Sequence, residues 1–498
     1  MIRAYSIPDV RAAEERAMAG LPEGELMQRA ARGLAGVVRA RARERGARTV
    51  AVLVGPGDNG GDALYAAALL SEAGLAVTAL VPGITVHTGG ERAAYEAGVV
   101  IVRLDRAAEA LDERAQQVLA EADIVLDGML GIGARPGLRG AMAALADGID
   151  DHSYVVAVDL PSGTDPEGLV PAAAAVHADE TVTFGIAKPV HLLPGTEPSV
   201  GRLTVVDIGV PEPERPAVER LTHDDVAGRW PVPGPADDKY SRGVLGVVAG
   251  SDHYPGAAVL VCSAAVGAGA GMVRYVGPDE PRRLVLAACP EVVPGPGRVQ
   301  AWVVGPGVPP DDEEQRAAVR AALLEGVPVV ADAGALDVVA ELATSGGLPG
   351  TPLLLTPHAG ELARLLEALG GSGVTREDVL RRPLDHAREA ARRTGATVLL
   401  KGATTVVTAA DGPARSQADA PAWLATAGAG DVLAGLAGTL LSAGLDPLEA
   451  GSLAALVHGV AADRAAAGGP LRARAVAEAL PGTVAHLLTR RGQGDHRG

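Results

Sequence analysis

Aromatic residues and cysteine are scarce in this chain of 498 residues, and its 44 basic residues are outnumbered by 61 acidic ones. Only 2% of the residues are aromatic, so binding through extensive aromatic stacking is not expected. The two cysteines, Cys262 and Cys289, are too few for a disulfide framework and do not form a CxxC metal-binding pair. The formal net charge of −17 argues against nucleic acid or an anionic membrane as a partner, because either needs a basic surface.

Long apolar runs are also missing from the sequence. The first twenty residues carry charges throughout and lack the apolar core of a signal peptide. The least polar stretch, residues 257–273, is rich in Gly and Ala and slightly too short to span a bilayer. Since 48% of the residues are hydrophobic, the chain has ample material for buried cores. We therefore expect a soluble, cytoplasmic protein of two or three domains.

Three residue types are so rare that the remaining copies stand out. Lys occurs three times against 41 Arg, at Lys188, Lys239 and Lys401, while Asn59 and Phe184 are the single Asn and Phe. A Lys that Arg has not replaced suggests a place that needs a compact ammonium rather than a planar guanidinium. Chance retention is the alternative for any one of these residues, and it is a weaker explanation for the whole set.

Short β-branched or apolar runs alternate with Ala-rich amphipathic stretches along both halves of the chain. This alternation predicts βαβ units around mainly parallel sheets. Six prolines between residues 210 and 238 indicate a linker. The sequence therefore predicts two three-layer α/β/α domains, residues 1–218 (Rossmann-like) and 219–498. The predicted strands are 49–54, 77–81, 99–104, 124–126, 155–158, 180–184 and 203–207, then 244–249, 273–276, 301–304, 327–331, 353–355, 397–400 and 405–408.

A glycine-rich turn in the first half suits an anionic ligand. Residues 49–62 read Thr-Val-Ala-Val-Leu-Val-Gly-Pro-Gly-Asp-Asn-Gly-Gly-Asp and predict a strand and a turn, followed by a helix over 63–73. The free N–H groups at the start of that helix would face a phosphate. An ordinary turn capped by Asp62 is the alternative.

Two further strand ends in this half carry acidic residues. Asp127 precedes a second glycine-rich loop, 131–137, and Asp159 and Ser162 follow another strand. Because ligands of open parallel sheets bind at the carboxyl ends of the strands, we expect these loops to form one pocket. Taken singly, the acidic residues would be ordinary loop caps. Oxygen atoms of Asn59, Asp127 and Ser162 would suit a hard monovalent cation.

On these residues the first half resembles the NAD(P)H-hydrate epimerase family, whose phosphate turn reads Asn-Asn-Gly-Gly-Asp. Asp58 stands where the family usually has Asn and adds a carboxylate near the expected pyrophosphate. Asp62 and Lys188, whose ammonium would reach the pocket rim, are our candidates for the acid/base pair that interconverts the R and S hydrates. The resemblance implies K⁺ held by Asn59, Asp127 and Ser162. It also implies that the hydrated dinucleotide, NADHX or NADPHX, is bound by Asp58, Asn59, Gly60, Gly61, Asp62, Gly131, Ile132, Gly133, Ala134, Arg135, Pro136, Gly137 and Asp159.

The second half carries a glycine-rich helix start that suits a nucleotide. Residues 421–435 read Pro-Ala-Trp-Leu-Ala-Thr-Ala-Gly-Ala-Gly-Asp-Val-Leu-Ala-Gly and predict a helix that continues to about Ser442. The N–H groups of Gly428–Gly430 would face a phosphate, and Asp431 is placed to accept a proton from an attacking hydroxyl. A Gly-Ala-Gly-Asp run is weak alone in so Ala- and Gly-rich a chain. It is stronger when it follows, by about 30 residues, a strand that ends in Lys401-Gly402.

Other polar residues gather after the strand at 353–355. His358, Glu361 and Arg364 lie on one loop and the first turn of the following helix. A capping or core role is the alternative for His358, and plain packing is the alternative for Trp423.

This half resembles the ADP- or ATP-dependent NAD(P)H-hydrate dehydratase family, which has a ribokinase-like fold. Segments 239–243, 247–251, 254–257 and 269–273 match its opening pattern in order, while Ala429 replaces the family's usual Thr, as in sugar kinases. The resemblance implies that the hydrate contacts Ala257, Gly307, His358, Ala359, Gly360, Glu361, Leu362, Ala363, Arg364 and Asp431. It implies that the adenine nucleotide contacts Lys401, Gly402, Ala403, Thr404, Thr405, Pro421, Ala422, Trp423, Leu424, Ala425, Thr426, Ala427, Gly428, Ala429 and Gly430.

Together the two resemblances imply a bifunctional enzyme that repairs nicotinamide nucleotides. It would epimerise the R and S forms of NAD(P)HX and dehydrate the S form at the expense of ADP or ATP, with Mg²⁺ held mostly by phosphates and water. We expect small-molecule substrates, no nucleic-acid or membrane partner, and a homo-oligomer. The alternatives are a hydroxymethylpyrimidine- or sugar-type kinase fused to a dinucleotide-binding module, and a first half that binds a ligand without catalysis.

Overall fold

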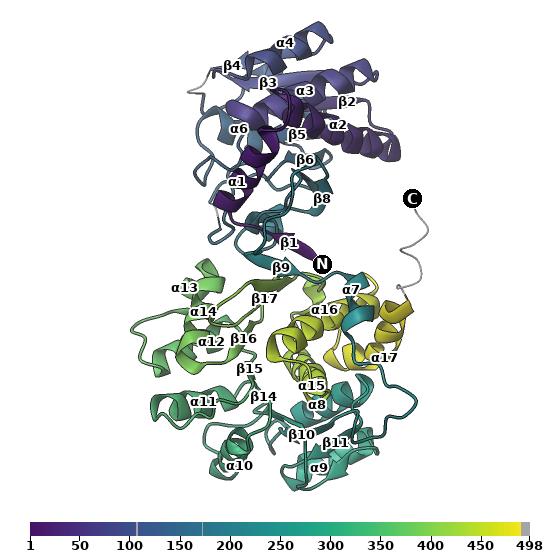
Figure 1. Cartoon of the computed structure of the whole chain (residues 1–498), viewed down its shortest axis with the longest axis vertical. Coiled ribbons are helices and arrows are strands. Elements are labelled where there is room, and N and C mark those ends of the chain that lie inside the picture. The colour runs from purple at the N-terminus through teal and green to yellow at the C-terminus, as the bar shows by residue number, and fades with distance from the viewer. Residues whose placement is uncertain (106–107, 172, 490–498) are drawn as a thin grey trace. The chain divides into compact units, whose positions relative to one another are not determined.

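The computed structural model describes residues 1–105, 108–171 and 173–489 and divides into two compact units (Figure 1). One unit contains residues 3–218, and the other contains residues 1–2 and 219–498. Across the described ranges, every helix is too short or too polar to cross a membrane.

A seven-stranded parallel sheet lies at the centre of the unit of residues 3–218. Its strand order is β4-β3-β2-β5-β6-β7-β8. The predicted runs 49–54 and 180–184 have the bounds of the observed strands, and the other predicted runs differ from them by one or two residues at an end. The strands are β2 (Thr49–Val54), β3 (Ala76–Pro82), β4 (Val100–Leu104), β5 (Ile124–Gly128), β6 (Tyr154–Val158), β7 (Glu180–Phe184) and β8 (Arg202–Val206).

Each face of this sheet has its own core. Val50, Val52 and Val54 of β2 pack with the helices on one face, whereas Ala51 and Leu53 pack with those on the other, because successive strand residues point to opposite sides. The first face is covered by α1 (Ile7–Met18), α2 (Glu25–Arg45), α3 (Gly57–Glu72) and α4 (Thr88–Glu96), and the second by α5 (Glu113–Ala120) and α6 (Ala141–Asp147). Two 3₁₀ turns, η1 (Pro189–His191) and η2 (Glu197–Ser199), complete the unit. The predicted α/β/α layering is confirmed.

The helix after β2 begins earlier than the sequence predicted. Helix α3 begins at Gly57 rather than at residue 63, so the residues expected in a turn form its first helical turns. Glycine makes this possible, since a Cβ on Gly60 would lie 2.0 Å from the carbonyl oxygen of Gly55. The missing side chain lets the helix approach the end of the strand closely.

An eleven-stranded sheet lies at the centre of the second unit. Its order is β1-β9-β18-β17-β16-β15-β14-β13-β10-β11-β12, with β17 antiparallel to both β16 and β18 and the strands from β16 to β12 parallel. The sequence did not predict β1, β9, β12 or β18. The strands are β1 (Ile2–Ala4), β9 (Val218–Arg220), β10 (Val244–Val248), β11 (Met272–Tyr275), β12 (Val293–Pro294), β13 (Ala301–Val304), β14 (Val329–Ala331), β15 (Leu353–Leu355), β16 (Thr397–Leu400), β17 (Thr405–Thr408) and β18 (Ala414–Gln417).

This sheet is also covered by helices on both faces. Leu245 and Val247 of β10 pack on one face with α8 (Pro255–Gly267), α15 (Ala429–Ser442), α16 (Pro447–Ala466) and α17 (Ala473–Thr489). Val244 and Val248 pack on the other with α10 (Glu313–Leu324), α11 (Ala335–Thr344), α12 (Ala359–Ala368) and α14 (Pro383–Thr394). Figure 1 shows α11 and α12 on one side of the strands and α15 and α16 on the other. The short helices are α7 (His223–Arg229), α9 (Asp279–Ala288), α13 (Arg376–Arg381) and η3 (Ala422–Leu424).

The proline-rich segment between the two predicted domains is partly structured. It contains β9 and α7, and Val226 and Trp230 are buried in the core of the second unit. The prolines therefore lie in the connection between the two units, and part of that connection is folded.

Candidate active sites

A cavity of about 670 Å³ lies at the carboxyl ends of the strands in the N-terminal unit. Its walls come from the start of α3, the loop after β5, the residue that follows β6 and the N-terminal helix α1. Parallel strands place their carboxyl ends at one edge of the sheet, which is why these loops meet. The lining residues are Arg11, Glu14, Pro56, Gly57, Asp58, Asn59, Asp62, Leu130, Gly131, Ile132, Gly133, Ala134, Asp159 and Phe184.

A buried ion pair forms one wall of this cavity. The ammonium of Lys188 donates to Asp159 Oδ1 at 2.6 Å, to Thr183 Oγ1 at 3.0 Å and to the carbonyl oxygen of Ile186 at 3.2 Å. Because Lys188 is only 1% exposed and all three of its N–H bonds have acceptors, it lies behind Asp159 and not at the rim where we expected it. Burial opposes ionisation of Asp159, but the charge of Lys188 outweighs it and keeps the pKa of Asp159 below its ordinary value.

Asp62 faces the same cavity with the opposite protonation preference. Its Oδ1 atom is buried and has no hydrogen-bond partner among the described residues. Burial, together with the nearby negative charges of Asp159 and Asp58, raises the pKa of Asp62 well above its ordinary value. Two carboxyl groups whose pKa values are pushed apart can serve as proton donor and proton acceptor in one site.

Three predicted cation ligands lie together beneath the loop after β5. Ser162 donates to Asp127 through both its hydroxyl, at 2.6 Å, and its main-chain N–H, at 2.8 Å. Asn59 Nδ2 donates to the carbonyl oxygen of Leu130 at 3.1 Å, and the N–H of Leu130 donates to Ser162 Oγ at 2.8 Å. Burial raises the pKa of Asp127 to about 6, against the effect of its hydrogen bonds. One buried carboxylate with neutral oxygen atoms around it fits a hard monovalent cation.

A second cavity, of about 800 Å³, lies in the C-terminal unit. It extends from the ends of β15 and β16 past the hairpin of β17 and β18 to the start of α15. The lining residues are His358, Lys401, Gly402, Ala403, Thr405, Gln417, Asp419, Ala420, Pro421, Ala422, Leu424, Ala425, Thr426, Ala429, Gly430, Leu433, Ala455 and His458.

Lys401, at one end of this cavity, lies close to two acidic side chains that are outside the cavity lining. Its Nζ atom lies 2.8 Å from Asp332 Oδ1 and 3.7 Å from Glu361 Oε2. Burial opposes protonation of Lys401, but Asp332 and Glu361 outweigh it, so its pKa is raised. Burial and the charge of Asp332 raise the pKa of Asp431 to about 7, although Lys401 acts in the opposite direction. Asp431 is therefore poised to take up or release a proton near neutral pH.

The turn before α15 depends on a glycine. Gly428 has φ +86°, and a Cβ there would lie 2.5 Å from Leu260 Cδ1. This conformation ends the loop where α15 begins, and the first N–H groups of a helix can bind an anion. In the described part of the chain, no group of three or more His, Cys, Asp and Glu side chains is arranged to hold a metal ion.

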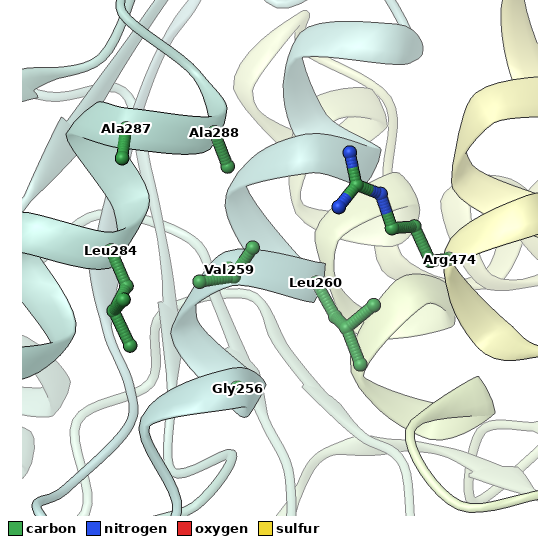
Figure 2. Close-up of a pocket in the computed structure, with 7 residues that line it drawn as sticks. All are labelled: Gly256, Val259, Leu260, Leu284, Ala287, Ala288 and Arg474. Atoms are coloured by element: carbon green, nitrogen blue, oxygen red, sulfur yellow. The ribbon is translucent and has the colours of Figure 1, made fainter.

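Leu260 also lines a separate, largely apolar hollow between α8, α9 and α17. Figure 2 shows the side chain of Arg474 reaching from α17 toward α8 beside it. The hollow is lined by Gly256, Val259, Leu260, Leu284, Ala287, Ala288 and Arg474, none of which we predicted as a site residue.

Two family models match the two units of the chain. Residues 23–190 match the YjeF-related protein N-terminus, and residues 245–480 match NAD(P)H-hydrate dehydratase. The bifunctional NAD(P)H-hydrate repair enzyme Nnr of Mycobacterium tuberculosis is 43% identical over 461 residues, which cover 90% of this chain and 90% of the relative. The chain belongs to the family of bifunctional NAD(P)H-hydrate repair enzymes.

A second family member and one solved structure are also similar to parts of this chain. The Nnr enzyme of Mycobacterium leprae is 44% identical over 477 residues, covering 93% of this chain and 94% of that enzyme. The crystal structure of an ADP/ATP-dependent NAD(P)H-hydrate dehydratase from Bacillus subtilis, co-crystallised with ATP/Mg²⁺, is 26% identical with a TM-score of 0.48. It covers 54% of this chain and 98% of its own.

Not every residue that we assigned to the N-terminal site lines its cavity. The lining includes Asp58, Asn59, Asp62, Asp159 and the loop residues Gly131, Ile132, Gly133 and Ala134. Gly60 and Gly61 instead allow close packing, against Gly55 and against His87 and Met27 respectively. Arg135, Pro136 and Gly137 lie beyond the lining, and the N–H of Gly137 donates to the carbonyl oxygen of Gly163.

The C-terminal predictions divide in a similar way. Ala257 and Gly307 adjoin each other outside the cavity lining, where a Cβ on Gly307 would lie 2.7 Å from Ala257 Cβ. Leu362 and Ala363 are buried in the core and Arg364 points to solvent, because α12 presents one face to the sheet. They belong to the six predicted residues at the start of this helix, which are Ala359, Gly360, Glu361, Leu362, Ala363 and Arg364. Trp423 is 51% exposed and, like Thr404, Ala427, Gly428 and Asp431, does not line the cavity.

Several residues in the two sites were not predicted. Asp332 directly follows β14 and pairs with Lys401. In the first half we selected Asp127 and Asp159 because they lie at or just after the end of a strand, and the same criterion would have selected Asp332. Arg11 and Glu14 come from α1, far along the chain from the other lining residues. Gln417 ends a strand that we did not predict, and His458 lies inside a helix with the pattern of a core residue.

Proposed function

We propose that this chain catalyses both steps of NAD(P)H-hydrate repair, with epimerisation in the unit of residues 3–218 and nucleotide-dependent dehydration in the other. The assignment rests above all on family membership along nearly the whole chain. It is supported by Asp62, which lines the N-terminal cavity and has a strongly raised pKa, and by Asp431, whose pKa is also raised and which follows the cavity residue Gly430. We expect the enzyme to act in the cytoplasm as a homo-oligomer.

In the first step, we propose that Asp62 and the pair of Asp159 with Lys188 move the protons of epimerisation. The raised pKa of Asp62 favours its protonated form, while Lys188 favours the ionised form of Asp159. Protonated Asp62 would donate to the substrate and ionised Asp159 would accept. Lys188, as a positioning residue, would then act through Asp159 instead of touching the substrate.

In the second step, phosphoryl transfer turns a poor leaving group into a good one. The hydrate carries a hydroxyl on C6 of the nicotinamide ring, and hydroxide leaves slowly. Asp431 would take the hydroxyl proton while that oxygen attacks the terminal phosphorus of ADP or ATP. The nucleotide without its terminal phosphoryl group, AMP or ADP, would then leave. Loss of phosphate from C6 and of a proton from C5 restores the double bond of NAD(P)H. The N–H groups at the start of α15 would stabilise the charge of the transferred group.

Two metal ions fit this scheme in different ways. Mg²⁺, when bound, would neutralise the charge of the nucleotide phosphates, which would hold it together with water. We assign K⁺ to Asn59, Asp127 and Ser162 in the first unit, where a cation would compensate the buried charge of Asp127.

Replacing K⁺ by Li⁺ at equal ionic strength is expected to destabilise the N-terminal unit. At a K⁺ concentration about 100 times its Kd, binding would add about 2.7 kcal/mol to the free energy of unfolding. The pKa of Asp127 is raised in the folded state, so without a cation its ionisation lowers stability as the pH rises from its ordinary pKa to about 6. The K⁺ effect should therefore grow across that range. Thermal unfolding of the full chain in KCl and LiCl measures it.

Asp127→Asn is the matched variant for this experiment. It is nearly isosteric and removes the buried charge, so we expect its melting temperature to respond equally to K⁺ and Li⁺. An unchanged K⁺ response in Asp127→Asn would place the cation elsewhere.

The proposed function is tested by the return of absorbance at 340 nm. Hydrated NADH is incubated with the full chain, Mg²⁺ and either ADP or ATP. We expect recovery of NADH with release of phosphate and with consumption of both epimers. A stable phosphorylated product from a vitamin precursor or a sugar, with no recovery of NADH, would instead identify a small-molecule kinase.

A further inference from the structure

Two buried polar side chains in the C-terminal cavity have hydrogen-bonding atoms without partners. Both polar atoms of the Gln417 amide, and Nε2 of His458, have no partner among the described residues. Gln417 is 3% exposed and His458 is 5% exposed, so bulk water does not supply the missing bonds. Buried polar groups in folded proteins are nearly always paired, which makes two such side chains in the lining of one cavity unusual.

The fold places both side chains at the cavity from separate elements. Gln417 ends β18 and lies directly opposite Thr405 of β17 in the antiparallel register. Thr405, which lines the same cavity, belongs to the segment that we assigned to the nucleotide. His458 lies on α16 and forms a hydrogen bond to the main chain of Ala429, in the first turn of α15.

The hydrogen bond to Ala429 fixes which ring nitrogen of His458 carries the proton. Burial lowers the pKa of His458 to about 4, so the imidazole is neutral at physiological pH. Because Nε2 is the unpartnered nitrogen, we assign the bond with the Ala429 main chain to Nδ1 and place the ring hydrogen there. His458 therefore presents Nε2 as a fixed acceptor, whereas the Gln417 amide can be turned to offer either its donor or its acceptor.

The remaining lining defines the shape of the ligand part that would meet these atoms. Leu424, Leu433 and Ala455 give apolar walls, and Lys401 and Gly430 lie at the cationic, phosphate-binding end. An apolar slot with a fixed acceptor and an adaptable amide matches a flat heterocycle that carries an amino group on its edge. Adenine is such a ring, since its 6-amino group donates and its N1 atom accepts.

We propose that Gln417 and His458 recognise the edge of the adenine ring and select adenine over other purine nucleotides. This inference rests on the nucleotide site of the proposed function. His458 is the discriminating residue, because its fixed acceptor requires the 6-amino group. Gln417 contributes affinity, because its amide can adapt to an amino or an oxo group at that position.

Comparison of ADP with inosine diphosphate tests this proposal. Inosine diphosphate has an oxo group in place of the amino group, so His458 Nε2 would face an acceptor. We expect the full chain to bind ADP at least about tenfold more tightly than inosine diphosphate, measured by titration calorimetry with Mg²⁺. His458→Leu should reduce this ratio to about threefold or less, mainly by weakening the binding of ADP. Gln417→Leu should weaken the binding of both nucleotides by about tenfold and change the ratio of their affinities little.

Two further variants separate recognition from structure. His458→Gln can still present an amide oxygen, so we expect it to retain a preference for ADP. Thr483→Val also removes a buried oxygen atom without a partner, but Thr483 does not line this cavity, so neither affinity should change.

The outcomes distinguish this inference from the proposed function. If the unsubstituted chain binds ADP and the ratio is the same in His458→Leu, the inference is wrong and the nucleotide site stands. If the unsubstituted chain binds neither ADP nor ATP, the proposed function fails and the inference fails with it.

Discussion

Replacing Asp431 by Asn is expected to lower the rate of nucleotide-dependent dehydration by about 10²–10⁴-fold, the usual contribution of a general base. The amide keeps the size of the side chain but cannot accept the hydroxyl proton. Nucleotide binding should persist, because the N–H groups at the start of α15 and Lys401 remain. Epimerisation should be unchanged, since it belongs to the other unit.

The pH dependence gives an independent check on Asp431. Its pKa is raised to about 7, and only the deprotonated form can act as a base, so the rate should rise as the pH passes through that value and then level off. Absorbance recovery at 340 nm with the S hydrate and ADP, measured across this range, gives the profile. Asp463→Asn, at an exposed position on α16, is the matched control and should retain the rate of the unsubstituted chain. Full activity in Asp431→Asn would remove this residue from the mechanism.

Replacing Lys188 by Met is expected to have the largest effect on stability. It leaves the carboxylate of Asp159 buried without its cation, and loss of one partner of a buried pair costs about 3–5 kcal/mol. Epimer exchange should also fall sharply, because unpaired Asp159 would become protonated and lose its function as a proton acceptor. Thermal unfolding of the full chain and exchange between purified R and S hydrates measure the two effects.

A double variant separates the two contributions of Lys188. Asp159→Asn combined with Lys188→Met removes both charges, so much of the lost stability should return while epimerisation stays absent. The control is Arg32→Met, which breaks the surface pair of Arg32 with Glu25 and should cost at most about 1 kcal/mol. A Lys188→Met protein as stable as the unsubstituted chain would show that the pair adds little to stability, and unchanged epimer exchange would show that Lys188 is not needed to keep Asp159 ionised.

Much of each site was predictable because its signals are local in the sequence. Gly428 is found from the backbone conformation that a turn before a helix needs. Asp159 and Lys401 are found because they are polar and directly follow a strand. Both signals lie within a few residues of the sequence. Parallel strands then bring such strand ends to one edge of the sheet, whatever the loops between them. The start of α3 was misplaced because the glycines there allow a close approach to Gly55, which is a tertiary contact and not a local preference.

The sequence by itself determined the α/β/α class, most strand positions, the glycine-rich helix starts and the family resemblance of each half. Hydrophobic periodicity and backbone conformation depend on neighbouring residues, so these features can be inferred without coordinates. Only the tertiary structure decided that Lys188 lies behind Asp159, that Asp332 pairs with Lys401, and that Gln417 and His458 meet in one cavity. Burial and the charges of residues distant in the chain set these pairings and the protonation of Asp62 and Asp431, and no local pattern records them.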